Sequence, residues 1–183
     1  ILEKLKDDEA DTVRRSVANN LNDISKDHPE LVLEICERWY GHSERTDWIV
    51  KHACRGLLKA KNRRALRLFG LGETRNVRVQ NFKLVQKRIT VGEEVSFSFA
   101  LRVGGRRECK VRLEYTIDFV KAQGGVGRKV FQIAEKNFAP GVYKMGKSYS
   151  TADKTTRKHY AGKHRVALVI NGKEMAEAAF VLV

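Results

Sequence analysis

The spacing of apolar residues changes near residue 75 of this 183-residue chain. Before this point, apolar side chains recur every three or four residues, which is the period of an amphipathic helix. After it, they alternate with polar side chains, which is the period of a strand with one buried face. Because helices and strands bury different patterns, the change predicts an α + β multidomain chain with an all-α domain over 1–75 and an all-β domain over 76–183.

Residues that favour helix N-termini divide the first half into separate predicted helices. Asp11 or Thr12 is suited to cap the N-terminus of one helix, and Thr46 or Asp47 that of another. Pro29 fits the first turn of a helix between them, since proline lacks the N–H that this turn leaves unpaired. The predicted helices cover residues 1–6, 11–25, 29–40, 47–60 and 62–69.

A faint internal repeat with an offset of 36 residues runs through these helices. It places Asp11 over Asp47 and aligns Val13 with Ile49. Helical hairpins repeated at this period are typical of HEAT-like or armadillo solenoids. We therefore predict HEAT-like helical repeats in the first half, with chance similarity between two helices as the alternative.

The second half contains segments with clear strand alternation. Val95, Phe97, Phe99 and Leu101 share one face of the first such segment, and a second segment alternates in the same way over 111–119. Further strands are predicted in KVFQIA, HRVALVIN and EAAFVLV.

Two dipeptides predict hairpins in this half. Gly104-Gly105 follows the first clear strand, and Asn171-Gly172 is typical of a two-residue type I′ turn. Six or seven strands with such turns predict an immunoglobulin-like β-sandwich, here without a disulfide. The full expectation is therefore all-α HEAT-like repeats followed by an all-β immunoglobulin-like sandwich.

The positive charge is concentrated in the second half. The formal net charge of the chain is +14. Residues 1–75 carry 15 Lys and Arg against 13 Asp and Glu, whereas residues 76–183 carry 21 against 9. An excess of this size indicates a polyanionic partner, nucleic acid before membrane. No run of 18 apolar residues occurs, so no membrane partner is expected.

A stripe of cations and amides follows the polar side of helix 11–25. Arginine and lysine neutralise phosphates and asparagine donates hydrogen bonds, so the stripe suits a sugar-phosphate backbone. A plain solvated face is the alternative, although such faces favour Glu, Lys and Gln over Asn. The stripe consists of Arg15, Asn19, Asn22 and Lys26, and it continues on helix 47–60 with Lys51, Arg55 and Lys59.

Two segments of the second half combine cations with small or polar residues. KAQGGVGRK (121–129) places basic residues around three glycines, which let a backbone approach a ligand closely. KSYSTADKTTRKHYAGKH (147–164) is the second, with Lys154 and Arg157. Phosphate contact is the functional interpretation, and ordinary hairpin loops are the alternative for both. The candidate contacts in the first segment are Lys121, Gln123, Arg128 and Lys129.

Catalytic and metal-binding patterns are mostly absent from the sequence. Cys36, Cys54 and Cys109 are far apart and odd in number, so we expect reduced thiols, no metal site and no cofactor. Asp11 and Asp23 are the carboxylates on or near the polar stripe that are candidates for catalytic groups. For Asp11, a role as a helix cap is the plain alternative.

Two long segments of the first half, VRRSVANNLNDISKDHPELVLEICERW and TDWIVKHACRGLLKAKNRRALRLFG, resemble the AlkC branch of the HEAT-like DNA alkylation repair glycosylases. In the second half, LEYTIDFVKAQG, KVFQIAEK and STADKTTRKHYAGKHRVALVINGK resemble the immunoglobulin-like domain of some AlkC members. The resemblance covers nearly the whole chain. It implies a monofunctional glycosylase that removes cationic alkylated bases, 3-methyladenine among them, from double-stranded DNA without flipping the nucleotide.

The resemblance also implies roles for individual residues. Asp11 is the first candidate, and Asp23 the second, for a carboxylate that stabilises the oxocarbenium sugar and orients the attacking water. The basic loops of the immunoglobulin-like domain would reach the opposite face of the duplex. We expect a monomer in the bacterial cytoplasm, associated with the nucleoid. The residues implied to hold the backbone near the lesion are Arg14, Arg15, Asn19, Asn22, Lys51 and Arg55.

The chain departs from the family at its beginning. Family members carry further helical repeats before this point, including a segment resembling RRLASEG-RPRLPW. We therefore expect a C-terminal fragment that lacks part of the active site, and whether it is active by itself stays open. The competing interpretation is a non-catalytic DNA-binding or protein-interaction module, because fold alone does not define function. Steep salt dependence of binding would favour DNA over a protein partner.

Overall fold

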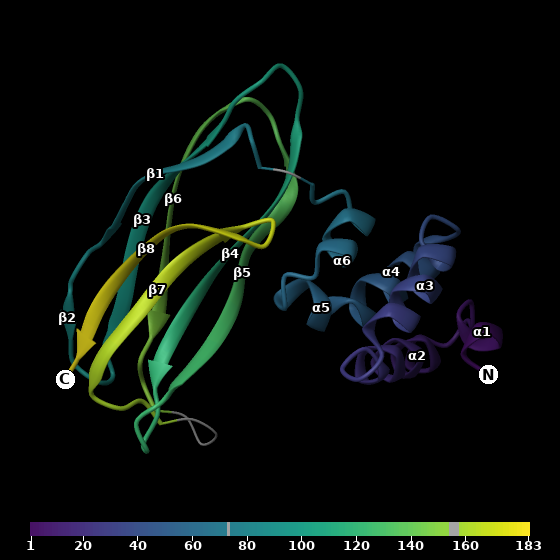
Figure 1. Ribbon diagram of the computed structural model, residues 1–183, viewed down its shortest axis with the longest axis horizontal. Helices are drawn as coiled ribbons and strands as arrows, with labels where there is room; N and C mark the ends of the chain where they lie inside the picture. Colours follow the sequence, from purple (N-terminus) through teal and green to yellow (C-terminus); the bar gives the residue numbers. More distant parts are fainter. Residues whose placement is uncertain (73, 154–157) are drawn as a thin grey trace. The chain divides into compact units, whose positions relative to one another are not determined.

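The chain divides into two units, Ile1–Gly70 and Leu71–Val183. The structure is a computed structural model that describes residues 1–72, 74–153 and 158–183 (Figure 1). Lys154 and Arg157, two cations of the second basic segment, lie outside the described residues. Among the described helices, none has both the length and the apolar character needed to cross a membrane.

The first unit is built from helices that bury one apolar side each. On α2 the buried residues include Val17 and Leu21, and on α3 they include Leu33 and Trp39. Burial of such side chains stabilises each helix more than its intrinsic propensity does. The helices of the described residues are α1 (Leu2–Leu5), α2 (Asp11–Ile24), α3 (Pro29–Trp39), α4 (Glu44–Ala53), α5 (Arg55–Lys59) and α6 (Arg63–Leu68).

Helix starts differ in part from the predicted ones. Pro29 is the first residue of α3, as predicted. The predicted caps of the other two helices are wrong. Ala10 precedes α2, so Asp11 lies in its first turn, and Ser43 caps α4 by accepting a hydrogen bond from the backbone N–H of Thr46. The side chain of Thr46 in turn accepts from the backbone N–H of Ser43, which completes a reciprocal cap.

The predicted fold class, HEAT-like helical repeats followed by an all-β immunoglobulin-like sandwich, is wrong. The described residues form six short helices and eight strands in two sheets, with 28% helix and 42% strand. The two helices related by the 36-residue offset differ in length, with 14 residues in α2 and 10 in α4. The predicted helix 47–60 is broken at Cys54, where the backbone leaves the helical region. Apolar spacing indicates that a segment is helical but not that successive helices match and stack.

The second unit contains two sheets. The three-stranded sheet has the order β1-β3-β6, and the five-stranded sheet has the order β2-β8-β7-β4-β5 (Figure 1). All pairs are antiparallel except that of β2 with β8, which is parallel. The strands are β1 (Val77–Leu84), β2 (Arg88–Ile89), β3 (Glu94–Val103), β4 (Cys109–Val120), β5 (Val126–Phe138), β6 (Gly141–Ser150), β7 (Gly162–Ile170) and β8 (Lys173–Leu182).

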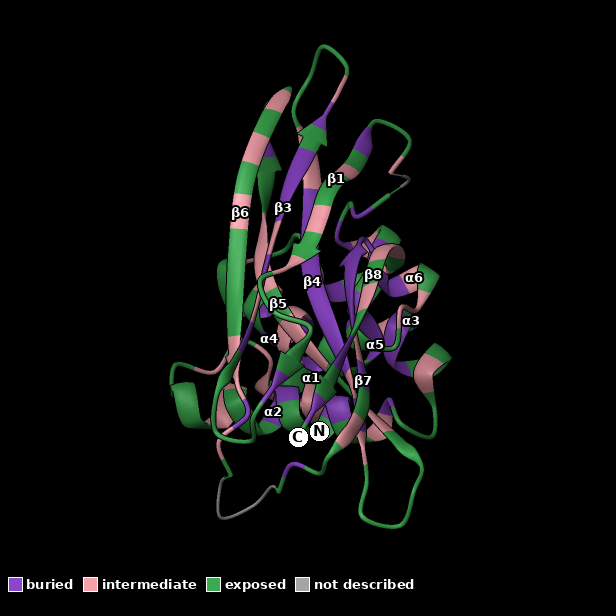
Figure 2. Ribbon diagram, turned by 90° about the vertical axis from the view of Figure 1, so that its left-hand side faces the viewer, coloured by how far each residue is buried: buried purple, intermediate pink, exposed green. Residues whose placement is uncertain are grey.

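Apolar side chains from both sheets form one core. Phe97 of β3 meets Tyr115 of β4 edge to face, with ring centroids 5.2 Å apart. Figure 2 shows that β3 and β4 are largely buried. The predicted alternation is confirmed in both strands, because the residues of each predicted apolar face are buried. These residues are Val95, Phe97, Phe99 and Leu101 on β3, and Val111, Leu113, Tyr115, Ile117 and Phe119 on β4.

The two predicted hairpins have different outcomes. Asn171-Gly172 does connect β7 and β8, and its φ angles of 46° and 79° are the left-handed pair that a type I′ turn requires. Gly104-Gly105 is not a hairpin, because β3 and β4 belong to different sheets and the segment crosses between them. Strand β6 was not predicted at all. Its polar side chains and its glycines conceal the alternation, as is common for an edge strand with one exposed face.

One buried histidine of the second unit is held in a neutral form. The side chain of His164 is 1% exposed, and its ring stacks on Phe180 with centroids 5.2 Å apart. The backbone N–H of Val120 donates to Nδ1 at 3.4 Å, and Nε2 donates to the carbonyl of Tyr160 at 3.0 Å. Burial lowers the pKa of His164 below its ordinary value of 6.5, because the charged ring would lose its hydration.

Stability should therefore fall as the pH falls below about 6.5. The unfolded chain binds a proton at His164 near its ordinary pKa, whereas the folded chain resists it, so acid favours unfolding. We expect His164→Gln to reduce the slope of the unfolding free energy against pH between 7 and 5. The measurement is urea unfolding at several pH values, with His28→Gln at an exposed position as the control. An unchanged slope in His164→Gln would show that other groups cause the pH dependence.

Candidate nucleic-acid interface

A polar cluster lies where α2 meets the end of α4 and the start of α5. Nη2 of Arg55 donates to Oδ1 of Asn19 at 3.3 Å, and Nη1 of Arg55 lies 2.6 Å from Nε2 of His52. The His52 ring stacks on the indole of Trp48, with centroids 5.1 Å apart and planes 22° apart. Trp48 is 40% exposed, so the cluster presents an aromatic surface beside a cation and an amide. We call Asn19, Trp48, His52 and Arg55 the α2–α5 cluster.

His52 is the neutral member of this cluster. Nε2 of His52 lies 2.6 Å from Nη1 of Arg55, a donor, and 3.0 Å from Oδ1 of Asn19, an acceptor, so its hydrogen-bond role depends on the tautomer of the ring. Partial burial and then the nearby charges of Arg55 and Arg15 lower the pKa of His52 below its ordinary value. The cluster therefore carries its positive charge on arginine, which suits contact with phosphate.

Asp23 lies beside this cluster on the same helix as Asn19. Its Oδ1 accepts a hydrogen bond from Nζ of Lys26 at 2.8 Å, and its side chain is 69% exposed. The hydrogen bond from Lys26, the charge of Lys26 and the charge of Arg55 lower the pKa of Asp23. Asp23 is thus an ionised carboxylate, and among the described residues only one of its oxygens has a partner.

Asp11 is more fully engaged. Its Oδ1 accepts from Nη2 of Arg14 at 3.2 Å, and its Oδ2 accepts from Nε of Arg15 at 2.8 Å. Arg14 also donates to the carbonyls of Asp8 and Glu9 at 2.6 and 2.8 Å. These contacts hold the turn that precedes α2. Both carboxylate oxygens of Asp11 are therefore committed to local structure.

Two residues of the predicted stripe are directed away from solvent. Asn22 is 8% exposed, and its Oδ1 is buried without a hydrogen-bond partner among the described residues. Nζ of Lys51 lies 4.5 Å from the centroid of the Phe69 ring in a cation–π contact. The exposed part of the stripe therefore consists of Arg15, Asn19, Lys26, Arg55 and Lys59.

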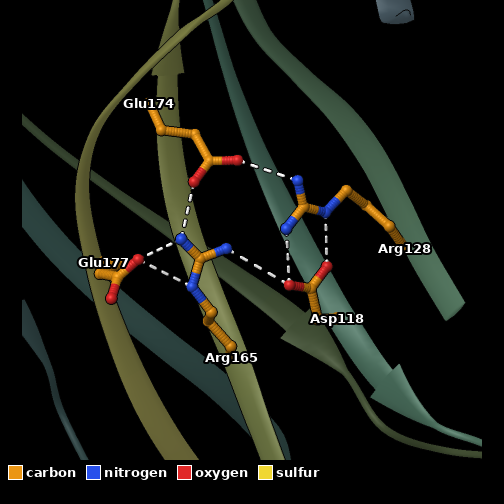
Figure 3. Close-up of polar contacts among 5 residues, drawn as sticks. All are labelled: Asp118, Arg128, Arg165, Glu174 and Glu177. Atoms are coloured by element: carbon orange, nitrogen blue, oxygen red, sulfur yellow. Dashed lines mark hydrogen bonds and ion pairs between the residues drawn. The ribbon is translucent and has the colours of Figure 1, made fainter. Parts of the chain in front are cut away.

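The predicted loop 121–129 is split between a turn and a strand. Lys121 and Gln123 are exposed in the turn after β4, and Lys129 is exposed on β5. Arg128, also on β5, pairs with both oxygens of Asp118 at 2.6 and 2.7 Å and with Glu174 at 2.9 Å (Figure 3). These carboxylates neutralise the guanidinium, so Arg128 is the least suited of the four to bind phosphate.

Sequence reasoning missed Trp48 and His52. The two residues are four apart on α4, so they lie on one face of the helix and their rings can stack. This four-residue spacing of two rings, on a helix that also carries cations, could have indicated an aromatic contact in the sequence. Whether these rings meet a ligand depends on their exposure, which no spacing reveals.

Comparison with known proteins defines the class. The chain is similar over 100% of its length to 51% of the solved structure of Pseudomonas fluorescens alkylpurine DNA glycosylase AlkC bound to DNA containing an abasic site analog, with a TM-score of 0.94 and 39% identity. It is also 48% identical over 174 residues to the uncharacterized protein YhaZ of Bacillus subtilis (strain 168). The matched segment covers 94% of this chain and 48% of YhaZ. The chain thus spans about half the length of the relatives it matches.

The chain is of the AlkC type with a C-terminal domain. More particularly, residues 78–183 match the model of the C-terminal Ig-like domain of the uncharacterised protein YhaZ, and the chain belongs to this family.

Proposed function

We propose that this chain is part of a DNA repair glycosylase that excises cationic alkylated purines, such as 3-methyladenine, from double-stranded DNA. The similarity to the DNA-bound AlkC structure, at 39% identity and a TM-score of 0.94 over the whole chain, carries this proposal. Because the similarity extends over both units, a non-catalytic module is not favoured. The partner is DNA containing alkylated bases, and the acting form is a monomer in the cytoplasm.

The proposed reaction is hydrolysis of the N-glycosidic bond. The bond between C1′ and the base nitrogen breaks, and its electron pair neutralises the positive charge of the departing base. The sugar becomes oxocarbenium-like, water attacks C1′, and the proton of that water passes to solvent. An ionised carboxylate lowers the energy of the cationic sugar without needing a proton of its own.

We assign this carboxylate to Asp23 in preference to Asp11. Asp23 is ionised, is more than two-thirds exposed and has one oxygen without a partner among the described residues. Both oxygens of Asp11 are occupied by arginines of its own helix. Asn19 and Arg55, next to Asp23, would hold the phosphates on either side of the lesion.

The test is release of 3-methyladenine from methylated duplex DNA by the full-length protein, measured by chromatography of the free base. We expect release to depend on enzyme concentration and to leave an abasic strand that alkali cleaves. The control substrate is the same duplex without methylation. An absence of release from either duplex, with DNA binding retained, would overturn the enzymatic proposal.

Reversal of one charge should test the DNA surface of the first unit. Arg55→Glu places a carboxylate where a phosphate is proposed to bind, so affinity should fall about equally for duplexes of different sequence. The slope of log K against log salt should decrease by about 0.9 for the one phosphate that the variant no longer neutralises. Fluorescence anisotropy measures both, with Lys4→Glu on α1 as a control of equal charge change. Equal affinity of the two variants would exclude the α2–α5 cluster from the DNA surface.

A further inference from the structure

One ring nitrogen of the α2–α5 cluster faces two groups that it cannot satisfy together. Nε2 of His52 lies 2.6 Å from Nη1 of Arg55 and 3.0 Å from Oδ1 of Asn19. The guanidinium can only donate a hydrogen bond and the amide oxygen can only accept one, whereas Nε2 of a neutral ring carries either a lone pair or a hydrogen. The nitrogen therefore bonds one of these neighbours and opposes the other.

The contact between Arg55 and Asn19 does not remove this conflict. Nη2 of Arg55 donates to Oδ1 of Asn19 at 3.3 Å, so the amide presents its oxygen to both neighbours. If the amide were turned round, its NH₂ group would face the N–H of Arg55, and two donors would oppose each other. Each orientation of the amide therefore leaves at least one of the three contacts unsatisfied.

Distance and charge favour one form of the ring in the free protein. With a hydrogen on Nε2, two donors would oppose each other at 2.6 Å, and Arg55 would be the charged one. With a lone pair on Nε2, the opposed atoms are the ring nitrogen and the oxygen of Asn19 at 3.0 Å, and neither carries a full charge. Hydrogen bonds from a charged donor are also the stronger ones. The form with a lone pair on Nε2 of His52 therefore has the lower energy, and it holds the guanidinium on the protein.

The charges around His52 act in the same direction. The ring stacks on Trp48 of its own helix, and the charged groups that act on it are Arg55 from α5 and Arg15 from α2. Burial first, and then these two positive charges, lower the pKa of His52 below its ordinary value of 6.5. An anion that neutralises the two arginines would remove the part of this shift that their charges cause.

We propose that His52 is a positioning residue that holds Arg55 in the free protein and passes its Nε2 contact to Asn19 when Arg55 binds a DNA phosphate. The inference rests on the proposed function for the identity of the anion. A phosphate oxygen replaces Nε2 as the acceptor of Arg55, and Nε2 with a hydrogen then donates to Oδ1 of Asn19. In a neutral ring, Nε2 gains this hydrogen from solvent while Nδ1 loses one to solvent. In acid, Nε2 gains it from solvent and Nδ1 keeps its own.

Nitrogen NMR tests this exchange of partners directly. The sample is the full-length protein labelled with nitrogen-15 histidine, and the signals of His52 are identified by their loss in His52→Gln. The shift of a ring nitrogen reports whether it carries a hydrogen or a lone pair. At about pH 8 we expect a lone pair on Nε2 in the free protein and a hydrogen on it when an undamaged duplex is bound. The same Nε2 shift with and without bound duplex would overturn the proposal.

Uptake of a proton gives a second measurement. Because bound phosphate offsets the charges of Arg55 and Arg15, the pKa of His52 should rise on binding, and affinity should increase as the pH falls through about 6.5. Anisotropy titrations at one fixed salt concentration should show log K rising by up to about one unit per pH unit, the limit for one proton. This rise should disappear in His52→Gln and persist in His42→Gln, which changes an exposed histidine in the turn before α4. An equal rise in both variants would exclude His52 as its cause.

Two substitutions separate positioning from packing. His52→Gln retains an amide oxygen that can accept from Arg55, whereas His52→Phe keeps a ring to stack on Trp48 and has no acceptor. At about pH 8 we expect His52→Phe to bind duplex about fivefold more weakly than the wild type, and His52→Gln to stay within about twofold. Equal affinity of both variants and the wild type would show that the ring does not hold Arg55.

These outcomes are distinct from those of the enzymatic proposal, because undamaged duplex measures binding whereas release of the free base measures chemistry. An unchanged Nε2 shift, with 3-methyladenine still released from methylated duplex, would overturn the role of His52 and leave the glycosylase proposal standing. Failure of the wild-type protein to bind duplex at any pH would overturn DNA as the anion, and this inference with it.

Discussion

Replacing Asp23 with asparagine should reduce the release of 3-methyladenine by the full-length protein by about a hundredfold or more, while DNA affinity stays close to that of the wild type. The amide keeps the size of the side chain but removes the negative charge that would stabilise the oxocarbenium sugar. Lys26 and Arg55 keep that carboxylate ionised in the free protein, so the wild-type rate should not fall until the pH is well below neutral. Single-turnover assays with saturating enzyme measure the chemical step apart from binding.

Asp11→Asn is the matched control, because it makes the same chemical change on the same helix. Its carboxylate holds Arg14 and Arg15, so its removal should loosen the turn before α2 and leave base release largely intact. Loss of release in Asp11→Asn with normal release in Asp23→Asn would reverse the assignment. Melting curves of both variants show whether either loss of activity reflects unfolding.

Removal of Arg112 should produce the largest loss of stability in the second unit. The side chain of Arg112 is 5% exposed, and its guanidinium bonds Glu114 at 2.6 and 2.9 Å and Glu135 at 2.6 Å. Arg112→Met would leave these carboxylates buried without the guanidinium they now share. We expect the free energy of unfolding in urea to fall by about 3–5 kcal/mol.

Arg128→Met is the control for this effect. Arg128 also bonds two carboxylates on the same sheet, but its side chain is 42% exposed, so water can solvate those carboxylates in its place. The substitution should cost no more than about 1 kcal/mol. Combining Arg112→Met with Glu114→Leu and Glu135→Leu should recover most of the stability, because no charge is then left buried. Equal losses of stability in Arg112→Met and Arg128→Met would show that burial does not determine how much these ion pairs contribute to the free energy of unfolding.

Local patterns in the sequence predicted much of the secondary structure. The alternation of Val95, Phe97 and Leu101 predicted a strand and its buried face, and both are present. Asn171-Gly172 predicted its turn because few other residues adopt two consecutive left-handed conformations. Each of these features depends on residues that are neighbours in the chain.

Features that join distant segments were not predictable in this way. The broken helix at Cys54 and the passage from β3 to β4 between sheets overturned expectations that rested on local spacing. The candidate site was likewise predicted only in part. Asn19 and Arg55 belonged to the predicted stripe, but the ring stack of Trp48 on His52 beside them was not predicted.

The order of the residues sets where helices and strands form, and how many positive charges the second half carries. Which of those charges can meet a ligand depends on how the chain folds in space. Arg128 is neutralised by Asp118, ten residues away, and by Glu174, 46 residues away, whereas Arg78 is the direct cross-strand partner of another cation, Arg102. These pairings matter because an electrostatic interaction depends on distance in space, and strand pairing sets that distance for residues far apart in the chain.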